Sequence, residues 1–217
     1  MSSTNRSDAR DTHIADYYVT PIEDIELFLN EFEKVEQLDW LNSKILDPCA
    51  GGNEEIPEYE AYHPMSYPVA IHNIYNKHID TIDIREDSFA FTKGDYLQIK
   101  LDYQPNIIIT NPPFNQAVEI INKALVDVAD NGYVIMLLRL NFFGSKDRFS
   151  FFQKQLPKYC FVHHIRIGFT DKKDKETGKL ILDKEGNPKK GSTDSIEYCH
   201  MVWQKGYKPE FTQLKVI

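Results

Sequence analysis

The chain has 217 residues, of which 41% are hydrophobic and 27% charged, so it is long enough for one soluble domain with a full core. A net charge of −8 argues against a uniformly basic nucleic-acid binder, and the lack of an apolar run near ~20 residues argues against a membrane span. We expect no signal peptide, because residues 1–13 are polar and carry both signs of charge, and three widely spaced cysteines favour a reduced, cytoplasmic protein without structural zinc.

The predicted elements of the first half alternate between helices and strands. Residues 1–15 have the composition of a disordered segment, and residues 16–217 are expected to form a single domain. Thr20 is the expected N-cap of a helix that starts at Pro21, with apolar residues at helical spacing up to Phe32. The elements expected next are a strand (44–47), a loop (48–53), an irregular segment (54–65), a helix (68–77) and a strand (79–84).

The second half continues the alternation. Its expected elements are a turn (94–97), strands at 106–110 and 133–138, helices at 117–129 and 146–156, and strands at 161–169 and 196–203. Residues 171–195 are charged and turn-rich, with a small hairpin expected about 185–188. Strands alternating with helices indicate an α/β fold with a doubly wound, mostly parallel sheet. The last two strands lack a helix between them, so they are expected to pair antiparallel.

Charge is distributed unevenly along this order of elements. Residues 1–39 hold ten acidic and three basic residues, a net of −7, whereas residues 139–190 hold six acidic and thirteen basic residues, a net of +7. A basic region of this size suits contact with phosphates. A solvated, lysine-rich surface with no partner is the alternative.

Four segments carry residues suited to ligand binding, and three of them have aspartates at the carboxyl ends of predicted strands or in adjoining turns, where α/β proteins bind ligands. The first is the loop from Asp47 to Gly52, whose glycines permit close backbone approach and whose carboxylate can accept from an ammonium. Asp83 is placed to hold two ribose hydroxyls, with Asp87 as a rival, and Asp95 can accept from the amino group of an adenine. Taken singly, each aspartate is more often a helix cap or a turn former.

The fourth segment is Asn111-Pro112-Pro113-Phe114, directly after the apolar strand 107–109. The two prolines end the strand, and the asparagine amide and the Pro112 carbonyl then offer two acceptors beside an aromatic ring. Such a group suits a planar ligand that bears an NH2, such as the edge of adenine. A strand-ending turn with Phe114 in the core is the structural alternative.

With these four segments in this order, the chain resembles class I S-adenosylmethionine-dependent methyltransferases that methylate amino groups of DNA, most of all the small, phage-type N6-adenine enzymes. The resemblance covers roughly residues 16–205. In that family a D/N/S-P-P-Y/F/W tetrad is catalytic, and it corresponds here to Asn111, Pro112, Pro113 and Phe114. The resemblance implies a seven-stranded Rossmann-like sheet with an antiparallel final strand. It also implies S-adenosyl-L-methionine as cofactor, S-adenosyl-L-homocysteine as product, and no metal.

The resemblance also implies which residues bind the cofactor. These are Tyr18, Thr20 and Pro21 at the methionine end, Asp47, Pro48, Cys49, Ala50, Gly51 and Gly52 in the glycine loop, Asp83 at the ribose, Asp95 and Tyr96 at the adenine, and Asn111. The usual GxG of the loop appears here as Gly51-Gly52. Tyr17, Arg139, Phe142 and Phe143 are secondary candidates for the base pocket, the last two with buried packing as the simpler interpretation.

Under this resemblance we expect DNA recognition to fall to loops, because no segment after Trp203 in the given sequence is long enough for the recognition domain that larger relatives carry. The candidates for phosphate contacts are Lys172, Lys173, Lys175, Lys179, Lys184, Lys189 and Lys190. Six acidic residues share the segment 171–195, so a solvated hairpin is the alternative, and we expect low sequence specificity. The same chemistry on RNA adenine, on cytosine N4 or on a protein glutamine stays open, as does a non-catalytic module that binds nucleic acid or cofactor.

Overall fold

The computed structural model describes residues 19–52, 64–169, 181 and 196–217. Several predicted features lie outside these residues: the disordered segment 1–15, Tyr17 and Tyr18, most of the irregular segment 54–65, the hairpin about 185–188, and the seven lysines of residues 172–190. No helix in the described part of the chain is both long and apolar enough to cross a membrane.

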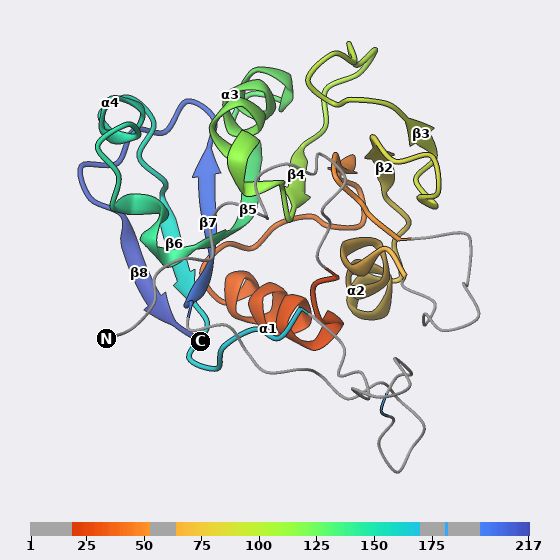
Figure 1. Cartoon of the computed structure of the whole chain (residues 1–217), viewed down its shortest axis with the longest axis horizontal. Coiled ribbons are helices and arrows are strands. Elements are labelled where there is room, and N and C mark those ends of the chain that lie inside the picture. The colour runs from red at the N-terminus through yellow and green to blue at the C-terminus, as the bar shows by residue number, and fades with distance from the viewer. Residues whose placement is uncertain (1–18, 53–63, 170–180, 182–195) are drawn as a thin grey trace.

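An eight-stranded sheet with the order β3-β2-β1-β4-β5-β7-β6-β8 forms the centre of the molecule (Figure 1). Its strands are β1 (Ile45–Asp47), β2 (Asp80–Asp83), β3 (Thr92–Lys93), β4 (Ile107–Thr110), β5 (Tyr133–Arg139), β6 (Tyr159–Val162), β7 (Tyr198–Gln204) and β8 (Gln213–Val216). β7 runs antiparallel to both β5 and β6, and the other neighbouring strands are parallel. The predicted α/β class, the mostly parallel sheet and the antiparallel pairing of the last two predicted strands are confirmed.

The sheet has one strand more than the seven that the resemblance implies, and the two strands that were not predicted individually are β3 and β8. β8 follows the antiparallel β7 and pairs in parallel with β6. β8 lies at the edge of the sheet, and Gln213, Leu214 and Val216 are exposed there. An exposed edge strand has no need of the buried apolar pattern by which the other strands are predicted. β6 ends at Val162, seven residues before the predicted end of that strand, and residues 164–166 after it are exposed.

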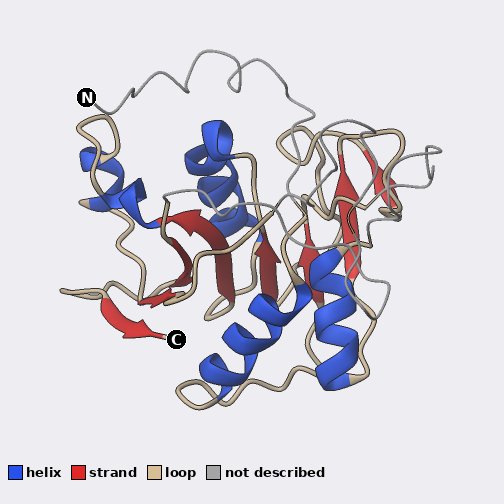
Figure 2. Ribbon diagram, turned by 60° about the horizontal axis from the view of Figure 1, so that its bottom comes forward, coloured by secondary structure: helices blue, strands red, loops and turns tan. Residues whose placement is uncertain are grey.

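Helices cover both faces of the sheet (Figure 2). α1 (Ile22–Glu33) and α2 (Ser66–Tyr75) pack on one face, whereas α3 (Ala117–Asp127) and the single-turn α4 (Phe149–Phe152) pack on the other. Two 3₁₀ turns, η1 (Phe114–Gln116) and η2 (Leu140–Phe143), follow β4 and β5. The helix predicted over 146–156 is therefore reduced to one turn.

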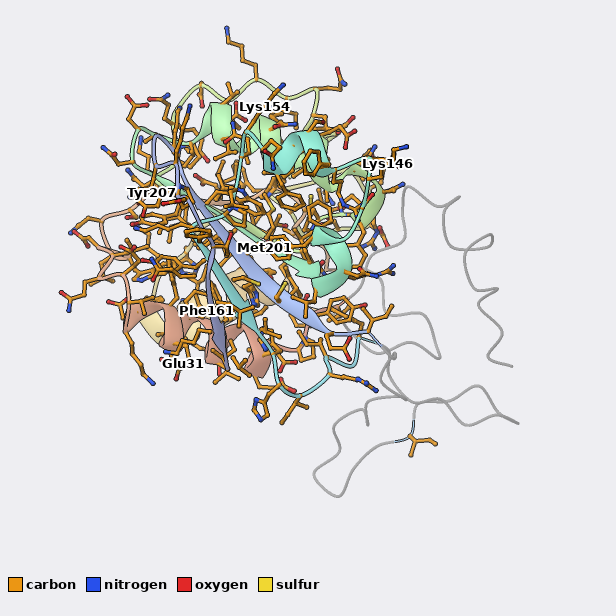
Figure 3. All side chains as sticks on the ribbon, turned by 90° about the vertical axis from the view of Figure 1, so that its left-hand side faces the viewer. Glu31, Lys146, Lys154, Phe161, Met201 and Tyr207 are labelled. Carbon is orange, nitrogen blue, oxygen red and sulfur yellow. The ribbon has the colours of Figure 1, made fainter. Side chains whose placement is uncertain are left out.

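Successive residues of the central strands point into opposite cores. In β4, Ile107 and Ile109 pack toward α1 and α2, while Ile108 packs toward α3. In the outer strands, Phe161 packs against the rings of α1, and Met201 lies in the core on the other face (Figure 3). A strand buried on both faces must be apolar throughout, which is why β4 and β5 were recognisable from sequence.

A buried polar chain ties α2 to the outer strands. The Tyr67 hydroxyl lies 3.0 Å from His200 Nε2, and His200 Nδ1 lies 2.9 Å from His163 Nε2. All three residues are at most 3% exposed, and burial lowers the pKa of His163 to about 4 and the pKa of His200 well below its usual value. His163 is buried and His164 exposed, as their alternation along the chain predicts.

We expect the free energy of unfolding to decrease as the pH falls from about 6.5 toward about 4. In this range His163 and His200 bind protons in the unfolded chain but stay neutral in the folded protein. His163 alone accounts for on the order of 3 kcal/mol across this window. Urea unfolding of the wild type and His163→Gln at about pH 7.5 and about pH 4.5 measures the two pH slopes. The free energy of unfolding should depend less steeply on pH in the variant than in the wild type. Equal slopes for the two proteins would contradict the role given to the buried His163.

Candidate cofactor and catalytic site

The sheet order brings all four predicted segments to one edge. β3, β2, β1 and β4 are consecutive parallel neighbours, so their carboxyl ends lie side by side. Asp83 and Asp47 are the last residues of β2 and β1, Asn111 follows β4 directly, and Asp95 follows β3 by two residues. The aspartates and the tetrad that are separate in sequence therefore lie at the same end of the sheet.

The glycine loop after β1 adopts a conformation that its glycines make possible. Gly51 and Gly52 have φ angles of 67° and 73°, in the left-handed region that other residues enter at a cost. The loop crosses the end of β2, where Ala50 N–H donates to the Ile82 carbonyl at 3.0 Å. The Ser88 hydroxyl donates to the carbonyl of Gly51. The backbone of the loop is thus fixed by these hydrogen bonds, and both glycines are buried.

Asp83 helps to hold this loop. Its Oδ2 accepts from Gly51 N–H at 2.7 Å, its Oδ1 accepts from Arg85 N–H at 2.8 Å, and the residue is 5% exposed. The Arg85 guanidinium donates to the Gly52 carbonyl at 3.2 Å and to Asp87 Oδ2 at 2.5 Å. Arg85 was not identified from the sequence as a residue that binds the loop. The Asp87 carboxylate forms an ion pair with Arg85. Contact of Asp83 with a ribose stays a prediction.

Asp47 is a buried acid with an unsatisfied oxygen. It is fully buried, its Oδ1 accepts from Cys49 N–H at 3.2 Å, and within the described residues Oδ2 has no hydrogen-bond partner. Burial raises the pKa of Asp47 to about 7, and the nearby Asp83 carboxylate adds to this increase. Burial likewise raises the pKa of the Cys49 thiol, so that loop cysteine is not an activated nucleophile. The hydroxyl of Thr110, the last residue of β4, lies close enough to the Asp47 carboxylate to oppose part of the increase in its pKa.

The segment after β3 is a turn, as expected. Asp95 Oδ1 accepts from Leu97 N–H at 2.9 Å, and the residue is half-buried. Tyr96 is 3% exposed, and its hydroxyl donates to Asp127 Oδ2 on α3 at 2.8 Å, with the Lys123 ammonium 4.7 Å from its ring centre. Tyr96 therefore anchors the turn to α3. The expected contacts of these two residues with an adenine stay predictions.

Within the tetrad, the structure fixes the amide of Asn111. Its Nδ2 donates to Thr20 Oγ1 at 3.1 Å, although the two residues are 91 positions apart. Thr20 is 2% exposed and is not the N-cap, which is Pro21 with no side-chain hydrogen bond to the helix. The N-cap prediction for Thr20 is wrong because its hydroxyl is taken up by the asparagine. This hydrogen bond fixes the orientation of the amide group, and it therefore also fixes the direction in which the acceptor Oδ1 points.

The ring of Phe114 is half-buried at the start of η1. The Arg139 guanidinium carbon lies 4.8 Å from the centre of this ring, and the Tyr198 ring lies at 6.0 Å. Arg139, one of the secondary candidates, thus borders the tetrad. Phe142 is 5% exposed within the core, and Phe143 packs on Phe152 at 5.1 Å, which agrees with the simpler interpretation of these two phenylalanines as packing residues.

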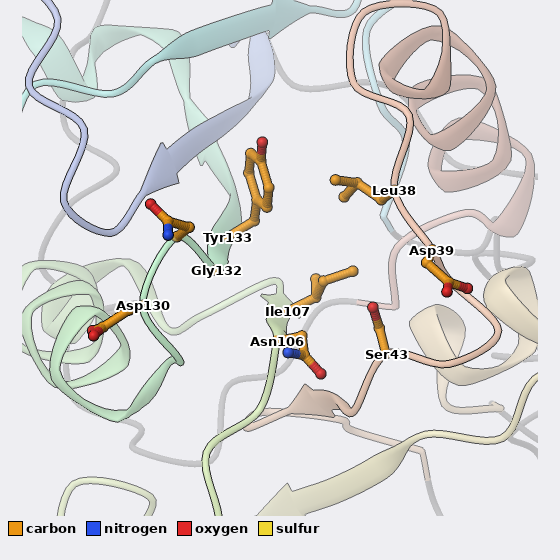
Figure 4. A pocket seen from close by; sticks show the side chains of 9 residues that line it. Leu38, Asp39, Ser43, Asn106, Ile107, Asp130, Gly132 and Tyr133 are labelled. Carbon is orange, nitrogen blue, oxygen red and sulfur yellow. The ribbon is translucent and has the colours of Figure 1, made fainter.

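A shallow pocket lies at the opposite edge of the sheet, by the amino ends of β4 and β5 (Figure 4). Its lining includes Leu38, Ser43, Asn106 and Tyr133, none of which belongs to the four segments. The described residues contain no group of three or more histidine, cysteine, aspartate or glutamate side chains placed to hold a metal ion.

No family model and no curated protein sequence matches this chain. Solved structures do resemble it in fold. A putative class I S-adenosylmethionine-dependent methyltransferase from Listeria monocytogenes is 13% identical with a TM-score of 0.54, and the match covers 92% of this chain and 65% of that protein, just under two thirds of its length. A putative RNA methyltransferase from Pyrococcus horikoshii is 15% identical with a TM-score of 0.54, covering 88% and 87% of the two chains.

A third structure, an S-adenosylmethionine-dependent O-methyltransferase from Thermotoga maritima, is 10% identical with a TM-score of 0.51, covering 91% of this chain and 70% of that one. At these identities the likeness establishes the architecture. The chain has the Rossmann-like fold of class I S-adenosylmethionine-dependent methyltransferases.

Proposed function

We propose that this protein transfers a methyl group from S-adenosyl-L-methionine to the exocyclic N6 amino group of an adenine in DNA. The observation that carries the proposal is the tetrad after β4, with the Asn111 amide held by Thr20 at the same sheet edge as the glycine loop. Such an arrangement combines two acceptors for an NH2 group with a site for a nucleoside-like cofactor.

The residues present fit this cofactor. Asp47 places a buried carboxylate beside the Thr110 hydroxyl at the carboxyl end of β1, and its negative charge suits the α-ammonium of the methionine part. Gly51 and Gly52 carry no side chain that would stand between the loop backbone and the cofactor. Asp83 ends β2, and Asp95 lies two residues beyond β3. When bound, the cofactor supplies an electrophilic methyl group carried on a sulfonium.

The amine chemistry then depends on the tetrad. The lone pair of adenine N6 is delocalised into the ring, so the amine is a poor nucleophile. Asn111 Oδ1 and the Pro112 carbonyl can accept the two N6–H groups, which concentrates electron density on nitrogen and stabilises the positive charge that develops there. The amine nitrogen would take up the methyl group as the bond from that methyl to sulfur breaks, and the resulting cation would then release one proton to water. No strong base is needed before the transfer, because alignment of the amine supplies much of the rate gain.

Adenine in a duplex is reached only when it leaves the base stack. Phe114 is the last residue of the tetrad, at the start of η1, and offers an aromatic ring on which an extruded base can pack. The lysines of residues 172–190 are proposed to contact phosphates outside this pocket.

RNA adenine is the second candidate acceptor, because a protein of similar fold is described as a putative RNA methyltransferase. Tritiated S-adenosylmethionine offered with duplex DNA, RNA of matched sequence and a protein lysate separates the candidates. We expect label in DNA. Label in RNA or protein alone would keep the chemistry and replace the acceptor, and label in none of them with cofactor bound would favour a non-catalytic binding module.

Thr20→Val should lower kcat by about tenfold to a hundredfold, because the Asn111 amide loses the acceptor that fixes its orientation. Thr20→Ser keeps the hydroxyl and should retain most of the activity. The measurement is a comparison of kcat with the dissociation constant of the cofactor for both variants. A loss of cofactor affinity in Thr20→Val without a change in kcat would place Thr20 at the cofactor and not behind the asparagine.

A further inference from the structure

Arg139 is an unusual cation at the edge of the candidate site. It is the last residue of β5, the strand next to β4, and its guanidinium carbon lies 4.8 Å from the centre of the Phe114 ring. Its Nε is buried, and among the described residues this nitrogen has no hydrogen-bond partner. No carboxylate of the described chain lies within ion-pair distance of it, whereas the neighbouring Arg166 pairs with Glu197 at 3.2 Å.

A second arginine, Arg148, shows that an arginine over an aromatic ring can still have a hydrogen-bonded Nε. The Arg148 guanidinium lies 4.5 Å from the centre of the Phe142 ring, much as Arg139 lies over Phe114. Arg148 Nε nevertheless donates to the Phe142 carbonyl at 2.7 Å. A half-buried cation with an unsatisfied N–H is costly in the free protein, and a ligand that supplies an acceptor would remove this cost.

Few ligand groups are suited to accept hydrogen bonds from the Arg139 guanidinium. A guanidinium is always charged, and its planar fork suits the oxygens of a phosphate or a carboxylate. On a substrate that presents an amino group to the tetrad, a phosphodiester beside the target nucleotide is the anion that belongs to the same molecule. A protein glutamine brings no such group next to its amide.

We propose that Arg139 binds the phosphodiester next to the target base, so that the acceptor is a nucleotide within a chain. This inference rests on the proposed function and specifies what the site selects beyond the base itself. The guanidinium covers one face of Phe114 in this structure. A base that stacks on that face requires the guanidinium to leave it, and the phosphate is the partner that compensates for the lost contact.

The test compares Arg139→Gln with Arg148→Gln, a matched control in which a stacked arginine away from the tetrad is removed. The ligand is a fluorescent, adenine-containing single-stranded oligodeoxynucleotide, and anisotropy gives its affinity as a function of salt. Arg139→Gln should weaken binding by about tenfold to a hundredfold and reduce the slope of log K against log salt by about 0.7, the value of one phosphate contact. Arg148→Gln should change neither quantity. Arg139→Lys keeps the charge without the fork, so it should restore the slope and only part of the affinity.

Methyl transfer to the same oligonucleotide by the wild type distinguishes failure of the Arg139 inference from failure of the proposed function. If the wild type methylates it and Arg139→Gln keeps the wild-type affinity and salt slope, the Arg139 inference is wrong and the proposed function stands. An equal loss in Arg139→Gln and Arg148→Gln would also overturn the inference, since it would trace to packing. If the wild type neither binds nor methylates any nucleic acid, the proposed function itself fails and the inference fails with it.

Discussion

Asn111→Ala is expected to lower methyl transfer by a factor of about 10² to 10³ or more, because it removes a preplaced acceptor for the amine. The affinity for S-adenosylmethionine should stay nearly unchanged, since the glycine loop and Asp47 do not depend on this amide for their hydrogen bonds. Initial rates of label transfer and isothermal titration with the cofactor give the two quantities.

Asn115→Ala is the matched control for this variant, because Asn115 is an exposed amide one residue beyond the tetrad. It should leave both the rate and the affinity at wild-type values. If Asn111→Ala lost cofactor binding and rate together, the asparagine would be a structural support of the cofactor site, and its proposed role toward the amine would be wrong.

Asp47→Asn carries the second large effect, on cofactor affinity. The variant keeps the shape of the side chain and removes the charge opposite the expected ammonium, so affinity should fall by about tenfold to a hundredfold. In the wild type, affinity should also fall as the pH decreases below about 7, because Asp47 then takes up a proton in the free protein. It should fall again above about pH 8, where an α-ammonium loses its proton.

Titrations at about pH 6, 7 and 8 measure this dependence for the wild type, Asp47→Asn and the control Asp130→Asn, whose exposed carboxylate lies at the opposite end of the sheet. The dependence below pH 7 should vanish in Asp47→Asn and persist in Asp130→Asn. A raised carboxylate pKa also costs stability above pH 7, so Asp47→Asn should unfold no more easily than the wild type there. Affinities that do not change with pH in the wild type would remove Asp47 from the cofactor site.

The parts of the site that sequence predicted are those set by local chemistry. β4 is recognisable because a strand covered on both faces must be apolar, and the two prolines mark its end. The glycine loop is recognisable because left-handed φ angles at Gly51 and Gly52 favour that residue type. Strand order then brings these ends together without any further signal in the sequence.

The parts that sequence missed depend on contacts between distant segments. Thr20 followed by Pro21 has the local pattern of a helix N-cap, and only the partner 91 residues away decides that the hydroxyl bonds to Asn111. Arg85, two residues after the end of β2, donates a hydrogen bond to the Gly52 carbonyl. No spacing rule in the sequence connects these two residues. β8 escaped prediction because an exposed edge strand lacks the buried apolar pattern.

The most direct test of the account is nucleoside mass spectrometry of unmethylated duplex DNA after incubation with S-adenosylmethionine and either the wild type or Asn111→Ala. The account predicts N6-methyldeoxyadenosine with the wild type and almost none with the variant. Methylation at another atom, or an equal yield from both proteins, would contradict the claim that the tetrad after β4 presents an adenine amine for methyl transfer.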